Sequence, residues 1–165
     1  MKIKSILERN PIIPAIKDNI TLKKALNSNS ELVFIILASI VNIKEYCDKL
    51  KEKKKIIYVH IDMIDGLNST NNGIDYIMNT IKPDGILTTK SNVVAHAYKN
   101  NISVIQRFFI LDTLSYEKAL LNIKENKIAA AEIMPGLMPK IIKKLSQETH
   151  IPIITGGLIK EKEDV

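Results

Sequence analysis

Seven residues of chemically useful types follow apolar segments of this sequence, at the points where those segments end. They are Asp62, Lys90, Arg107, Glu132, Gly136, Gly156 and Gly157. Carboxylates accept hydrogen bonds from hydroxyl groups, lysine and arginine hold phosphate, and glycine lets main-chain N–H groups approach an anion closely. If the apolar segments are parallel strands of one barrel, the seven residues meet at one end of it. The pattern indicates a site for a small phosphorylated ligand.

The glycine pair is the strongest of these signals. Gly156 and Gly157 follow an apolar segment at a position where barrels commonly bind phosphate through main-chain N–H groups. A glycine pair also forms an ordinary tight turn, so both roles stay open. Gly136 gives a weaker signal of the same kind, because a helix is expected to begin directly after it and a helix N-terminus attracts anions.

Each charged residue also has a purely structural interpretation. Arg107 could bind phosphate, or it could form a buried ion pair with Glu132. Lys90 could bind phosphate or form a Schiff base, or it could be a solvated side chain beside a helix cap. Asp62 ends a segment that also contains His60, on the same side of the expected strand. We expect His60 to be a packed, hydrogen-bonded core residue rather than a catalytic base.

The elements that must position these residues alternate regularly along the chain. Strands are expected at residues 12–16, 32–37, 56–61, 85–87, 102–105, 129–134 and 151–154, and helices at 21–26, 42–54, 73–81, 92–100, 115–126 and 137–147. Thr21, Asn42, Asn92 and Ser115 are the expected helix N-caps. Alternating strands and helices form either a doubly wound sheet or a closed barrel. Polar residues follow nearly every strand, which favours an α/β fold of the TIM-like (β/α) barrel type, small and incomplete at the C-terminus, with seven strands.

Composition limits the class of protein. The 165 residues, 45% of them hydrophobic and 25% charged, are expected to form a single domain over residues 1–165. The lone Cys47 rules out an intrachain disulfide, and the sequence shows no signal peptide and no membrane-spanning run, so we expect a cytoplasmic location and no membrane partner. His96, His150 and Cys47 lack metal-ligand spacing, and we expect neither a metal nor a cofactor. The formal net charge of +6 permits RNA binding.

Five motifs in order resemble the glycerol uptake operon antiterminator regulatory family (GlpP-like). They are residues 59–67, 83–90, 105–112, 132–136 and 153–159. The resemblance covers nearly the whole chain and implies a barrel-like fold, glycerol 3-phosphate as effector, and binding to leader mRNA of glycerol-metabolism operons. The sequence departs from the family pattern at Ser39, where a glycine-acid pair is expected. Members of the family also continue past Val165 into a last strand, so the resemblance places part of the phosphate site there.

The leading hypothesis is therefore a non-enzymatic antiterminator that responds to glycerol 3-phosphate. Gly156 and Gly157 would hold the phosphate, with Lys90 or Arg107 as counter-charge, while Asp62 or Glu132 would bind the glycerol hydroxyls. Leader mRNA would contact basic helix surfaces at residues 49–55 or 140–144, and copies of the chain could form a homo-oligomer. The alternative is a phosphate-binding (β/α)-barrel enzyme acting on a small phosphorylated carbonyl or sugar substrate. A third hypothesis is an assembly partner without ligand affinity.

Overall fold

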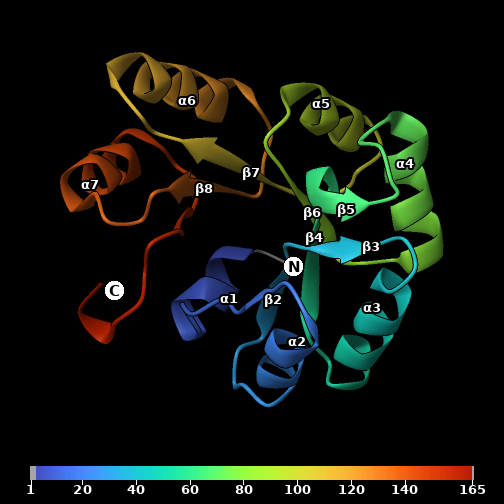
Figure 1. Cartoon of the computed structure of the whole chain (residues 1–165). Coiled ribbons are helices and arrows are strands. Elements are labelled where there is room, and N and C mark those ends of the chain that lie inside the picture. Colours follow the sequence, from blue (N-terminus) through green and yellow to red (C-terminus); the bar gives the residue numbers. More distant parts are fainter. Residues whose placement is uncertain (1–2, 165) are drawn as a thin grey trace.

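The central feature of the computed structural model, which describes residues 3–164, is a seven-stranded parallel sheet curled into a half-barrel (Figure 1). Its strands are β1 (Ala15–Ile16), β2 (Leu32–Ile35), β4 (Ile56–His60), β6 (Gly85–Thr88), β7 (Val104–Phe109), β8 (Ala130–Met134) and β9 (Ile153–Thr155). Each strand pairs with the next one along the chain. A doubly wound sheet would reverse this order at a switch point, so the sheet confirms the expected TIM-like, incomplete barrel. Strands β1 and β9 form its two edges.

Helices surround the outer face of this sheet (Figure 1). They are α2 (Asn19–Leu26), α3 (Ile43–Glu52), α4 (Asn71–Tyr76), the π-helix η2 (Ile77–Ile81) that continues α4, α5 (Ser91–Lys99), α6 (Thr113–Glu125) and α7 (Pro139–Glu148). Apolar residues spaced three and four apart place one face of each helix on the sheet. Cys47 of α3 is fully buried on that face, and burial raises the pKa of its thiol to about 12. Cys47 is a core residue, as its position in the helical pattern predicts.

Side chains of the strands alternate between two apolar clusters. Every second residue packs outward against the helices, and the residues between them face the inside of the half-barrel. We call the inward-facing set the inner cluster. Its buried members are Ile3, Ile6, Leu32, Phe34, Tyr58, Leu87, Ile105, Ala130 and Ile154. Two of these come from α1 (Ile3–Arg9), a helix that the sequence analysis missed. Helix α1 closes the end of the half-barrel where the strands begin, and Arg9 pairs there with Glu31, the residue before β2.

Of the four expected helix caps, Asn42 is confirmed and three are wrong. Asn92 lies at the second position of α5, whose N-cap is Lys90. Thr21 and Ser115 lie at the third position of α2 and α6, and the N-caps are Asp18 and Asp112. In both helices the aspartate accepts a hydrogen bond from the main-chain N–H of the third residue, whose hydroxyl bonds back to the N-cap. Such a reciprocal capping box places a hydroxyl residue inside the helix, where the sequence pattern cannot distinguish it from the cap.

Several short elements were also not predicted from the sequence. Strands β3 (Ala38–Ser39) and β5 (Ile64–Asp65) pair in parallel beyond the ends of β2 and β4. The 3₁₀ helix η1 (Ile61–Met63) ends β4 at His60, and a last 3₁₀ turn, η3, covers Lys162–Asp164. The strands of the main sheet all finish at the same end of the half-barrel. We call this end the mouth.

No helix within residues 3–164 is long and apolar enough to cross a membrane.

The contribution of α1 can be tested with two isoleucines of different burial. Ile6 is 1% exposed within the inner cluster and Ile20 of α2 is 67% exposed. Ile6→Ala should lower the free energy of unfolding by about 2–5 kcal/mol, because it leaves a cavity in a packed core. Ile20→Ala should change it by less than about 0.5 kcal/mol. Urea unfolding followed by circular dichroism measures both. Equal effects of the two substitutions would show that α1 does not pack inside the sheet.

Candidate functional site at the mouth of the half-barrel

Three polar side chains form a layer directly above the inner cluster. They are His60 of β4, Arg107 of β7 and Glu132 of β8, and we call them the polar layer. The strand residues two positions earlier are Tyr58, Ile105 and Ala130, all members of the inner cluster. Because side chains alternate along a strand, the polar layer must face the interior as well. His60 is 2% exposed and Glu132 is 4% exposed, so the layer is buried.

Arg107 and Glu132 form a two-pronged ion pair inside the half-barrel. The Arg107 Nε donates a hydrogen bond to Glu132 Oε2 over 2.6 Å, and Nη2 donates to Oε1 over 3.3 Å. The two residues are register partners on adjacent strands, which brings their side chains together. The sequence left two roles open for Arg107, and the structure contains the buried ion pair. It uses only one side of the guanidinium, so the Arg107 Nη1 makes no hydrogen bond with the described part of the chain.

The contacts of the glycines differ from those that the sequence predicts. A Cβ at Gly156 would lie 2.8 Å from Glu132 Oε1, so a side chain at this point would displace the carboxylate of the ion pair. The Gly156 N–H donates to the Ile133 carbonyl over 3.1 Å, and the Gly136 N–H donates to the Gly157 carbonyl over 3.1 Å. These two N–H groups are therefore not free to hold phosphate, which corrects the expected role of Gly156. Within residues 3–164 the Gly157 N–H has no acceptor.

A cavity of about 740 Å³ lies beside the polar layer, on the open side of the half-barrel. Arg107, Glu132, Gly156 and Gly157 line it, together with apolar residues of β1, β2 and β9 and with one face of α1. The structure thus gathers four of the seven predicted site residues around one space. Gly136 lies behind this wall, where a Cβ would meet Ile159 at 2.9 Å. Gly136 supports the glycine turn from outside the cavity.

Asp62 and Lys90 form a separate group that does not line this cavity. Asp62 accepts hydrogen bonds from the Thr88 hydroxyl and from the main-chain N–H and hydroxyl of Thr89. Burial raises the pKa of Asp62, but these hydrogen bonds outweigh it and hold the pKa below its ordinary value. Lys90 is half exposed, bonds to Ser69, and lies 3.9 Å from the Asp62 carboxylate. In this structure Asp62 orders the loop between β6 and α5.

His60 is buried as the sequence predicts, but the expected hydrogen bond is absent. Its Nδ1 has no partner among the described residues. Burial, together with the nearby positive charge of Arg107, lowers the pKa of His60 to about 4, so the ring is neutral at pH 7. The sequence does contain a signal for its place in the site, because His60 follows the inward-facing Tyr58 by two residues, as Arg107 follows Ile105.

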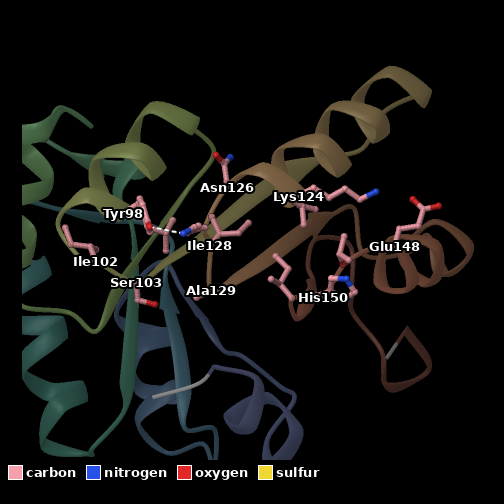
Figure 2. A pocket seen from close by; sticks show the side chains of 14 residues that line it. Tyr98, Ile102, Ser103, Lys124, Asn126, Ile128, Ala129, Glu148 and His150 are labelled. Atoms are coloured by element: carbon pink, nitrogen blue, oxygen red, sulfur yellow. Dashed lines mark hydrogen bonds between the residues drawn. The ribbon is translucent and has the colours of Figure 1, made fainter.

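A second cavity, of about 720 Å³, lies at the opposite end of the sheet, where β7, β8 and β9 begin. Figure 2 shows Tyr98, Lys124, Glu148 and His150 around it, and Lys127 donates a hydrogen bond to the Tyr98 hydroxyl over 3.0 Å. None of the seven predicted site residues lines this cavity. Within residues 3–164, no group of three or more histidine, cysteine, aspartate or glutamate side chains is arranged to hold a metal ion.

Comparisons with known proteins agree with this fold. The model of the family described as glycerol-3-phosphate responsive antiterminator matches residues 12–165. The chain is 29% identical over 164 residues to the uncharacterized protein YgcP of Escherichia coli K12. This alignment covers 99% of this chain and 86% of YgcP. A crystal structure of the glycerol uptake operon antiterminator regulatory protein from Listeria monocytogenes is 29% identical, with a TM-score of 0.87 over 94% of this chain and 84% of that one. A related protein from Thermotoga maritima is 27% identical, with a TM-score of 0.80 over 92% and 85%.

The ion pair of the polar layer can be compared with a matched pair on the surface. Arg9 and Glu31 form the same two-pronged contact, with side chains 57% and 40% exposed, whereas those of Arg107 and Glu132 are 12% and 6% exposed. Glu132→Gln should lower the free energy of unfolding by about 3–5 kcal/mol, because it leaves the guanidinium buried without a counter-charge. Glu31→Gln should cost less than about 1 kcal/mol. Chemical denaturation measures both, and similar costs would contradict the burial of the inner pair.

His60 should make stability depend on pH in a defined window. Its pKa is about 4 in the folded chain against an ordinary value of 6.5, so the unfolded chain takes up the proton first. The contribution of His60 to stability is complete above pH 6.5 and is lost as the pH falls toward 4, by about 3 kcal/mol at most. The free energy of unfolding of the wild type should therefore fall more steeply over this window than that of His60→Gln. Parallel pH curves would contradict a neutral, buried imidazole.

Proposed function

This chain belongs to the glycerol-3-phosphate responsive antiterminator family, and we propose that glycerol 3-phosphate binds in the cavity beside the polar layer and controls binding to leader mRNA of glycerol-metabolism operons. The family is one of regulators, so the conclusion is a ligand-controlled switch and not a catalyst. The observation that supports the effector site is a buried arginine with unused donors facing a cavity. Binding to nascent leader RNA would place the protein in the cytoplasm.

The groups around the cavity complement both halves of glycerol 3-phosphate. Arg107 offers the two N–H groups of Nη1, and Gly157 offers a main-chain N–H on the same wall. These donors suit phosphate oxygens, which only accept hydrogen bonds. Glu132 is a carboxylate that can accept hydrogen bonds from the glycerol hydroxyls. Lys4 of α1 lines the cavity as well and adds a second positive charge near its opening. Lys90, which the sequence offered as an alternative counter-charge, lies outside this cavity.

The alternative of a barrel enzyme receives less support from the geometry. A Schiff-base mechanism needs a desolvated lysine next to the substrate. The Lys90 side chain is 50% exposed and lies beside Asp62 and Ser69 rather than in the cavity. The arrangement thus favours reversible binding of a ligand over covalent chemistry with it.

For the RNA surface, the structure distinguishes between the two basic segments suggested by the sequence. In residues 49–55, Lys49 pairs with Glu45, Lys51 donates to the Ile81 carbonyl, and Lys55 donates to the carbonyls of Ser28 and Ser30. These three ammonium groups already have partners within the protein, whereas Lys53 and Lys54, which follow the end of α3, are exposed and bond to no described residue through their side chains. On α7, Lys144 pairs with Glu148, and Lys140 and Lys143 are exposed and bond to no described residue. We place the phosphate contacts of the leader RNA on α7, because Lys140 and Lys143 are three positions apart on one face of a helix.

Filter binding with leader RNA of a glycerol-metabolism operon tests the proposed function. Glycerol 3-phosphate at saturation should tighten RNA binding at least about fivefold, which is the lower end of usual allosteric coupling. Glycerol alone and inorganic phosphate alone should have little effect, because each presents only half of the ligand. The proposal would be contradicted if RNA binding did not change with glycerol 3-phosphate, disappeared with added salt and were equally strong for unrelated RNA.

Two double variants of equal charge change separate the RNA surface from general electrostatics in the same assay. Lys140→Glu with Lys143→Glu alters α7, and Lys23→Glu with Lys24→Glu alters exposed positions on α2. The α7 variant should bind leader RNA more weakly and reduce the dependence of affinity on salt, whereas the α2 variant should resemble the wild type. Equal losses in both would show that only net charge matters. Calorimetry should give unchanged affinity for glycerol 3-phosphate in both, since neither segment lines the cavity.

A further inference from the structure

Within residues 3–164, one buried side-chain nitrogen or oxygen has no hydrogen-bond partner, and it is Nδ1 of His60. The other buried polar side chains of the mouth are bonded: Glu132 to Arg107, and Thr88 to Asp62. An orphaned polar atom in a protein interior destabilises the fold, so proteins rarely keep one without a functional reason. The orphan lies in the polar layer and not in the apolar core, which makes a bound ligand its natural partner.

The position of His60 connects the two groups of polar residues at the mouth. Arg107 and Glu132 lie on β7 and β8, and Asp62 follows His60 directly at the end of β4. Both the Arg107 charge and the Asp62 charge act on the imidazole. His60 points to the same interior as Arg107, because it follows the inward-facing Tyr58 by two residues, although it does not itself line the cavity. A ligand held by Arg107 needs a polar arm to reach it.

We propose that His60 is a specificity-determining residue of the effector site, whose Nδ1 forms a hydrogen bond with a hydroxyl group of a bound polyol phosphate; this inference rests on the proposed function. A neutral imidazole has one N–H donor and one acceptor nitrogen. A hydroxyl can both donate and accept, so it satisfies Nδ1 in either tautomer, whereas a fully ionised phosphate group can only accept. His60 thus contacts the glycerol portion of the ligand, and Arg107 contacts the phosphate.

The burial of Nδ1 also links this contact to a conformational change. In the present structure the atom is covered by protein, so a ligand reaches it only after the imidazole or its neighbours move. The ligand then favours the rearranged state, because only that state gives His60 a partner. A difference in affinity between two states is what an effector needs to shift their populations.

Two substitutions at His60 and two ligands test this inference. The amide of asparagine can take the place of Nδ1, whereas phenylalanine keeps the ring and removes both nitrogens. Calorimetry should show that His60→Phe weakens glycerol 3-phosphate binding about tenfold, while His60→Asn stays within about threefold of the wild type. Inorganic phosphate, which has no glycerol arm, should bind equally to all three proteins. In the ¹⁵N-histidine spectrum of the wild type, glycerol 3-phosphate should shift the His60 Nδ1 signal and inorganic phosphate should not.

The outcomes separate this inference from the function on which it rests. If the wild type binds no glycerol 3-phosphate, the proposed function fails and the role of His60 fails with it. If the wild type binds, but His60→Phe binds equally well or the Nδ1 signal does not move, the inference alone is overturned. A loss of phosphate affinity equal to the loss of glycerol 3-phosphate affinity would also overturn it, because His60 would then contact the phosphate end. The spectrum of the wild type decides the matter even if His60→Phe fails to fold.

Discussion

The buried ion pair between Arg107 and Glu132 determines how the mouth of this half-barrel is built. Two charges can leave water only when they meet in good geometry, and the register of β7 and β8 provides that geometry. Gly156, which follows the next strand, leaves room for this carboxylate, because a Cβ there would lie 2.8 Å from Glu132 Oε1. The same glycine turn forms one wall of the cavity. Arg107 keeps donors that Glu132 does not use, and these are the donors that we propose for the phosphate of the effector.

Below this pair the inside of the half-barrel is filled mainly by apolar side chains. The inner cluster fills the space between the strands, and α1 closes it with Ile3 and Ile6. Above it lies the polar layer, which adds little to stability, since it combines a buried ion pair with an unpartnered imidazole. The apolar packing of the interior thus lies toward one end of the strands, and the proposed effector site lies toward the other.

The sequence predicted the strands better than it predicted the site. Runs of β-branched residues located all seven strands of the main sheet, because strands buried on both faces need such runs. Helix α1 was missed, since its seven residues are too few for a clear periodic pattern. Arg107 and Glu132 were recognised as a pair or as ligands, yet residue types alone could not decide between these roles. Gly156 was chosen for its free N–H, which in fact donates to the Ile133 carbonyl. Asp62 was chosen for its carboxylate, which also binds Thr88 and Thr89, and its role toward a ligand stays a prediction. Residue types could not show these contacts, because they join residues that are distant in the sequence.

The proposed effector site lies at one location, the cavity beside Arg107 on the open side of the sheet. A crystal structure of the protein with glycerol 3-phosphate tests this location most directly, because it shows where the phosphate lies relative to both cavities. We expect the phosphate within hydrogen-bonding distance of the Arg107 guanidinium and the Gly157 N–H, with the glycerol portion between Glu132 and His60. An ordered ligand in the cavity formed by Tyr98, Lys127 and His150 at the opposite end, with Arg107 left in contact with Glu132 alone, would contradict it.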